Sequence, residues 1–161
     1  MNPDEIDHYA SGGEKVRLAL RGLTTDDLTT VPDPAANIGR WSIHQVICHL
    51  ADCEQVYADR MKRIIAEDNP TLLAFDENKW AAGLHYEDQS IEDAVMLLEV
   101  TRRQMGRVLA AVPPPSFDRS ATHSETGRKT LADLIVGANK HLDHHLKFVH
   151  QKRAAMGKEM W

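Results

Sequence analysis

Three histidines, His49, His141 and His145, fall where their imidazole nitrogens could bind a divalent metal ion. His141 and His145 are four residues apart and continue a stripe of apolar residues that recur at three- and four-residue steps in 130–155. Side chains at this spacing lie on one face of a helix, with Cβ atoms roughly 6 Å apart. Two such imidazoles can reach one ion over bonds of about 2.0–2.1 Å. The pair therefore predicts a metal site that faces the protein interior.

His49 could supply a third nitrogen from a different segment, because it lies beside the apolar stripe of residues 42–67. Three neutral imidazoles that leave one coordination position open suit Zn²⁺, Ni²⁺ or Fe²⁺, and an open position is typical of a reactive centre. We refer to His49, His141 and His145 as the histidine cluster. Asp52 is three residues beyond His49 and could accept the second N–H of a histidine, which would fix the orientation of that ring.

A metal ion is not the only partner that these imidazoles could have. The chain has nine histidines in 161 residues, so a pair four residues apart arises easily by chance. An unpaired imidazole in a core costs about 1–3 kcal/mol, and either a metal ion or an ordinary hydrogen-bond network removes that cost. The spacing alone leaves both interpretations open.

Other candidate residues have different expected roles. His44 and His144 are predicted to be exposed to solvent, since His144 points about 100° away from His145 on a helix. His85 and His123 lie in loops that could fold over the metal and provide a fourth ligand or an acid–base group. The residues predicted to pack without a chemical role are Cys48, Cys53, Trp41 and Trp80.

Four segments show helical spacing of apolar residues, and each begins with a side chain that can cap a helix. The predicted helices cover residues 2–22, 42–67, 90–112 and 130–155. Their caps are Asn2, Ser42, Ser90 and Thr130. Gly12 and Gly13 should weaken or bend the first helix by roughly 1 kcal/mol each.

These helices predict an all-α fold, a four-helix bundle. The connection between the second and third helices, residues 68–89, is long, and long crossovers are how bundles depart from a simple up-down order. We therefore expect an up-down-down-up arrangement. No segment shows the strict alternation that predicts a β-strand.

The composition favours a single soluble domain over residues 1–161. The net charge is −5 without a long basic block, so neither nucleic acid nor a membrane is an expected partner. The N-terminus is acidic where a signal peptide would be basic, and no apolar run approaches the roughly 20 residues that cross a bilayer. Cys48 and Cys53 point in different directions on one helix and should not form a disulfide, which suits a reducing compartment. We expect a cytoplasmic protein.

The sequence resembles the DinB/YfiT-like superfamily in three segments. Residues 41–54, WSIHQVICHLADCE, are similar to its signature W-S-x-x-x-x-x-x-H-L-A-D-x-E, and residues 75–80 resemble its aspartate-to-tryptophan segment. Residues 130–145 are similar to its closing helix, in which H-x-x-x-H supplies two ligands. The resemblance implies a four-helix bundle, commonly a homodimer, that binds one divalent ion through the histidine cluster.

The resemblance also implies chemistry at the metal, but not one particular reaction. Some members of the superfamily resemble S-transferases that use a low-molecular-weight thiol, and many are regarded as hydrolases. We therefore expect a metal-dependent enzyme that acts on a small molecule, in which the ion is a Lewis acid toward water or toward a thiol cofactor. The alternative is a non-catalytic protein, either a metal-stapled structural module or a stress-response binding module.

Overall fold

The long helices begin at the caps that the sequence predicts. The computed structural model describes residues 1–159, so residues 160–161 of the predicted domain lie outside it. The four long helices are α1 (Pro3–Ala19), α3 (Ile43–Ala66), α5 (Ile91–Ala111) and α6 (Leu131–Ala155). Ser42 accepts a hydrogen bond from the Gln45 amide while the Gln45 side chain accepts one from the Ser42 amide, and Thr130 and Asp133 form the same reciprocal pair. These bonds satisfy amides that would otherwise be unpaired in the first turn.

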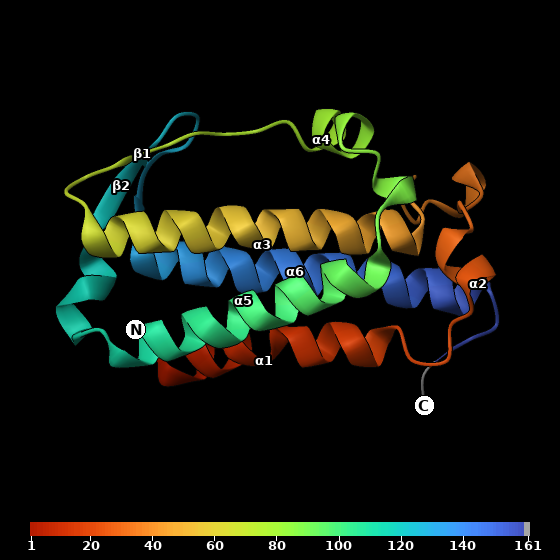
Figure 1. Ribbon diagram of the computed structural model, residues 1–161, viewed down its shortest axis with the longest axis horizontal. Helices are drawn as coiled ribbons and strands as arrows, with labels where there is room; N and C mark the ends of the chain where they lie inside the picture. Colours follow the sequence, from red (N-terminus) through yellow and green to blue (C-terminus); the bar gives the residue numbers. More distant parts are fainter. Residues whose placement is uncertain (160–161) are drawn as a thin grey trace.

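The bundle has the predicted up-down-down-up order (Figure 1). Helices α1 and α6 run in one direction, and α3 and α5 run in the other. Helices α1 and α3 each pack against both α5 and α6. The crossover after α3 returns the chain to the end where α3 began, and this is why α3 and α5 are parallel.

The structure adds three short strands that no alternating pattern in the sequence predicted. Strand β1 (Thr71–Leu72) lies in the crossover, and β2 (Ser120–His123) and β3 (Gly127–Thr130) form a hairpin before α6. β1 pairs in parallel with β2, and β2 pairs antiparallel with β3. Strands of two to four residues are too short to show an alternating pattern, so their pairing could not be predicted from the sequence. The sheet ties the crossover to the hairpin that carries His123.

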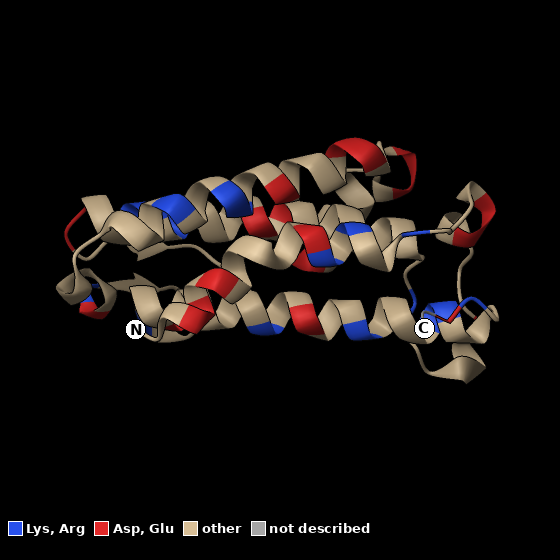
Figure 2. Cartoon of the chain, turned by 90° about the horizontal axis from the view of Figure 1, so that it is seen from below, with Lys and Arg blue, Asp and Glu red and all other residues tan. Residues whose placement is uncertain are grey.

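Short helices complete the connections. They are α2 (Thr25–Thr29) and α4 (Glu77–Gly83), together with the 3₁₀ turns η1 (Pro34–Ala36), η2 (Tyr86–Asp88) and η3 (Pro114–Asp118). Acidic and basic residues are interspersed along the helices in the view of Figure 2. No helix within residues 1–159 combines the length and the apolar content that a membrane span needs.

Helix α1 continues through its two glycines because α5 packs closely against them. A Cβ atom on Gly13 would lie only 2.6 Å from the Cα atom of Glu99, and one on Gly106 would lie 2.7 Å from the Cβ atom of Ala10. Glycine at these positions therefore permits a close approach of the two helices, which offsets its cost in helix propensity.

A buried polar group joins all four long helices. Arg102 on α5 is only 2% exposed, and its Nε donates to Glu54 on α3 over 2.6 Å. Its two Nη atoms donate to the carbonyl oxygens of Tyr9 on α1 and Ala138 on α6. The Tyr9 hydroxyl donates to the same Glu54 carboxylate. Both charges are thus paired inside the core, as buried charges must be.

Candidate metal centre

The structure brings the three rings of the histidine cluster together between α3 and α6. His49 Nε2 lies 3.2 Å from His141 Nε2. The centroid of the His145 ring lies 4.7 Å from that of His49 and 4.6 Å from that of His141. The two helices are antiparallel neighbours, so the first half of α3 faces the second half of α6. The three rings are therefore neighbours, as the apolar stripes predict, but His145 does not belong to the group of side chains whose donor atoms all lie within 4.8 Å of one another.

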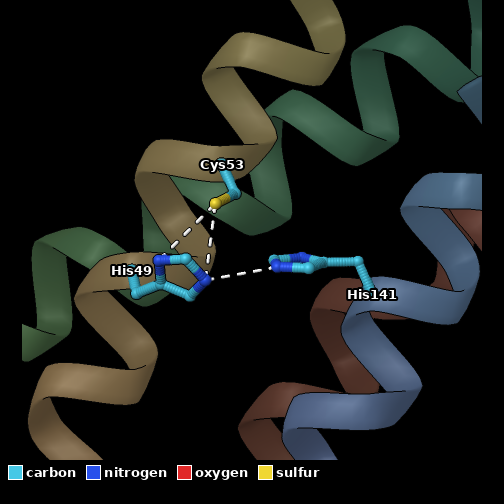
Figure 3. Close-up of side chains that lie close together, drawn as sticks. All are labelled: His49, Cys53 and His141. Carbon is cyan, nitrogen blue, oxygen red and sulfur yellow. Dashed lines mark hydrogen bonds between the residues drawn. The ribbon is translucent and has the colours of Figure 1, made fainter. Parts of the chain in front are cut away.

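Cys53 adds a fourth donor atom beside the cluster (Figure 3). Its Sγ lies 3.5 Å from His49 Nε2 and 3.6 Å from His49 Nδ1. Sγ and one nitrogen each of His49 and His141 all lie within 4.8 Å of one another. In Figure 3 the three side chains point toward a common space, two from α3 and one from α6. Cys53 is 5% exposed and so is buried as predicted, but its thiol also belongs to this donor group, which the sequence analysis missed.

The spacing of these donors fits a metal ion. Tetrahedral bonds of about 2.0–2.1 Å to nitrogen and about 2.3 Å to sulfur place two nitrogens about 3.3 Å apart, and nitrogen and sulfur about 3.5 Å apart. The two Nε2 atoms of His49 and His141 are 3.2 Å apart, which matches. Sγ is 3.5 Å from His49 Nε2 but also 3.6 Å from Nδ1, so the sulfur does not lie along the lone-pair direction of either nitrogen, and a side-chain rotation is needed before it can share an ion with Nε2. Imidazole and thiolate donors favour Zn²⁺ and other first-row transition ions over Mg²⁺ or Ca²⁺, which prefer oxygen.

Burial keeps the imidazoles in the form that binds metal. Burial, together with a smaller effect of neighbouring positive charge, lowers the pKa of His49 and His141 to about 4 and that of His145 to about 3. All three rings are therefore neutral at pH 7. Burial also raises the pKa of Cys53 to about 12, so without a cation its side chain is the thiol.

Asp52 does not occupy the position that we predicted. Within residues 1–159 its carboxylate forms no hydrogen bond with the histidine cluster and instead accepts one from the Tyr86 hydroxyl, over 2.7 Å. Tyr86 is fully buried, so this bond anchors the crossover to α3. The His49 ring instead packs against Trp41, with ring centroids 4.9 Å apart. Trp41 and Trp80 are packing residues, as expected.

Glu77 approaches the cluster from α4 and was not predicted from the sequence. Its Oε2 lies 3.9 Å from His49 Nε2. It lines two cavities, one of about 470 Å³ that reaches His141 and one of about 250 Å³ that reaches His145. The only sequence signal for Glu77 was its place in the segment that resembles the superfamily's aspartate-to-tryptophan motif.

The larger cavity also contains one of the two loop histidines. His123 on β2 lines it together with Cys53, Arg60, Glu77 and His141. The Nδ1 atom of His123 accepts hydrogen bonds from the amides of residues 125 and 126. These two backbone hydrogen bonds occupy Nδ1 and not Nε2, so Nε2 of His123 can contact a molecule bound in the cavity.

The remaining histidines lie apart from that cavity. His85 is 70% exposed and is close to Glu87, so its predicted contribution to the metal site finds no support in the structure. His44 is partly buried and bonds to the Gln89 carbonyl oxygen over 2.7 Å, so the prediction that it faces solvent was wrong. His144 is exposed, as predicted.

The fold and the site together define a four-helix bundle with a potential metal centre between its second and fourth long helices. The chain belongs to the DinB superfamily, because the sequence profile of that family matches residues 9–149.

Similar proteins come from several bacteria. A protein of Oceanobacillus iheyensis named "putative metal-dependent hydrolase" is 31% identical over 144 residues, which cover 89% of this chain and 83% of that protein. A Bacillus mycoides protein with the same description is 26% identical over 113 residues, or 70% of this chain and 65% of its own length. YfiT from Bacillus subtilis, whose structure is described as an unusual four-helix bundle, superposes with a TM-score of 0.87 at 22% identity, covering 96% of this chain and 86% of YfiT. This last similarity concerns the fold.

Proposed function

We propose that this protein is a metal-dependent hydrolase of a small molecule, with one divalent ion held by the histidine cluster. The observation that carries the proposal is the grouping of three imidazole rings from two helices, with ring centroids 4.6–5.1 Å apart, beside an accessible cavity. The names of the Oceanobacillus and Bacillus relatives, and the description of YfiT as "a probable metal-dependent hydrolase", support the same activity. When bound, the ion would supply Lewis-acid activation of water.

The residues around the cluster have complementary roles in this proposal. Trp41 holds the His49 ring in place by packing against it. The cavity of about 470 Å³ has the size of a small-molecule site, and Val56 and Phe75 contribute apolar walls. The Glu77 carboxylate, 3.9 Å from His49 Nε2, can take up a proton from the attacking water at Oε2. Arg60 provides the cavity with a positive charge that can hold an anionic group of the substrate.

The test uses the full chain without an affinity tag. Protein stripped with a chelator is reloaded with Zn²⁺, Ni²⁺ or Fe²⁺ and offered a panel of esters and amides, and elemental analysis gives the metal content of the untreated protein. His145→Ala should remove both bound metal and hydrolysis. His144→Ala is the matched control, because His144 is the exposed neighbour and its loss should leave both unchanged.

Three outcomes separate hydrolysis from the other predicted functions. Metal-dependent hydrolysis that is lost in His145→Ala supports the proposal. Consumption of a low-molecular-weight thiol with an electrophile, in the absence of hydrolysis, would replace it with the S-transferase function. Bound metal without either reaction would favour the non-catalytic binding module.

A further inference from the structure

We propose that Cys53 is a fourth ligand of this ion, so that the centre has three imidazole donors and one thiolate donor. The inference rests on one part of the proposed function, namely that an ion binds at the histidine cluster. The two helices present matching pairs of donors, His49 and Cys53 four residues apart on α3, and His141 and His145 four residues apart on α6. Residues at this spacing share a helix face, and donor atoms of three of these four side chains, His49, Cys53 and His141, lie within 4.8 Å of one another.

The position of the sulfur distinguishes Cys53 from an ordinary core cysteine. Its Sγ is not only against His49 but also within 4.8 Å of a nitrogen of His141, which belongs to the opposite helix. Its separation of 3.5 Å from His49 Nε2 equals the nitrogen–sulfur edge of about 3.5 Å in a tetrahedral site, and because Sγ is also 3.6 Å from Nδ1, a rotation of the Cys53 or His49 side chain is needed to bring both donors to one ion. Cys48 is equally buried on the same helix but does not belong to this donor group. Burial alone therefore does not place a thiol among metal-binding donor atoms.

Binding of the ion would convert the Cys53 thiol to the thiolate. The sulfur–metal bond forms as the S–H bond breaks, and the proton passes to solvent through the cavity that Cys53 and His141 line. A thiolate donor narrows the choice of ion toward Zn²⁺ and similar soft or borderline metals. Since four protein donors complete a tetrahedral centre, a substrate must add as a fifth donor or displace Cys53, which stands at the cavity wall.

Cobalt provides a direct test, because a thiolate bound to Co²⁺ gives a sulfur-to-metal charge-transfer absorption in the near ultraviolet that imidazole does not give. The untagged full chain, Cys53→Ser and Cys48→Ser are each titrated with Co²⁺. We expect the absorption in the unsubstituted protein and in Cys48→Ser, and its loss in Cys53→Ser. Zn²⁺ affinity, measured by competition with a chromophoric chelator, should fall by at least about tenfold in Cys53→Ser. Mutating a residue that only hydrogen-bonds to a metal ligand already lowers metal affinity by about that factor.

The failures of the two proposals are distinguishable. If the protein binds Co²⁺ without the sulfur absorption, and Cys53→Ser binds metal equally well, the role of Cys53 is overturned while the histidine site stands. If the unsubstituted protein binds no metal, both proposals are overturned. Circular dichroism of the metal-free variants checks folding. Should Cys53→Ser not fold, X-ray absorption of the zinc-loaded unsubstituted protein decides, with one sulfur at about 2.3 Å expected and only nitrogen or oxygen neighbours contradicting the proposal.

Discussion

Replacing Arg102 with methionine should lower the free energy of unfolding by several kilocalories per mole. The guanidinium makes three charge-assisted hydrogen bonds, to Glu54, Tyr9 and Ala138, and each such bond contributes about 1.5–3 kcal/mol. Methionine fills a similar volume and recovers about 1.5–3 kcal/mol by burying apolar surface. The net loss is then about 1.5–7.5 kcal/mol, a range that contains the about 3–5 kcal/mol typical of breaking a buried ion pair.

Urea unfolding followed by circular dichroism measures this loss. Arg103→Met is the matched control, since Arg103 is about half exposed, pairs with Glu99 at the surface and should change stability by less than about 1 kcal/mol. Glu54→Leu combined with Arg102→Met should recover most of the stability, because no buried charge is then left without a partner. A loss below about 1 kcal/mol for Arg102→Met would refute the conclusion that this cluster holds the four helices together.

Three further predictions follow from the packing and the titration of the core. Gly13→Ala should lower the melting temperature, because moving α1 away from Glu99 costs about 1–3 kcal/mol and the gain in helix propensity is at most about 1 kcal/mol. Gly83→Ala should not lower the melting temperature, because its new methyl group meets open space. Tyr86→Phe should cost about 0.5–1.5 kcal/mol in urea unfolding through the lost bond to Asp52; an unchanged midpoint would contradict this. With a chelator present to keep the protein free of metal, its free energy of unfolding should be highest above pH 6.5 and should fall toward pH 3–4. The reason is that the histidines of the cluster bind protons at a higher pH in the unfolded chain than in the folded one. A free energy of unfolding that is constant across this pH range would show that the rings are not buried as described.

The fold was largely predictable because its signals are local. Each long helix carries its own cap and its own apolar stripe, so the observed bounds differ from the predicted ones by at most three residues. The order of the helices was predictable from the length of the crossover alone. The three strands were not, because each is defined by a partner distant in the sequence rather than by its own pattern.

The buried ion pair also depends on a partner that is distant in the sequence. The pattern of α5 gives no reason to place a charged residue at 102 in the core, since charged residues are almost never fully buried unless they are paired. The partner, Glu54, is 48 residues away along the chain. The sequence contains both residues of the pair but not the packing of α3 against α5 that brings them together.

In the candidate site, too, the features set by helical spacing were predictable and the contacts with distant segments were not. The proximity of the three imidazole rings was predictable because helical spacing decides which face a side chain occupies, whereas their role as metal ligands stays a prediction. The partner of Asp52 was not, because Asp52 lies near His49 in sequence while its carboxylate meets Tyr86 from the crossover. Glu77 was missed for the same reason, as α4 is placed over the cluster by the path of the crossover.

Cys53 shows that core packing and metal binding are not competing interpretations of a buried residue. The rule that selects His141 and His145, two donors four residues apart on an apolar stripe, applies equally to His49 and Cys53. From the sequence alone the thiol was predicted only to pack as a small apolar side chain, because buried cysteines commonly do so. A metal centre inside a bundle takes its ligands from the apolar stripes themselves, so every ligand there must first satisfy the criteria for a core residue. Burial of Cys53 is therefore a condition of the proposed coordination, and the position of its sulfur beside His49 and within 4.8 Å of a His141 nitrogen is what favours a ligand over a packing residue.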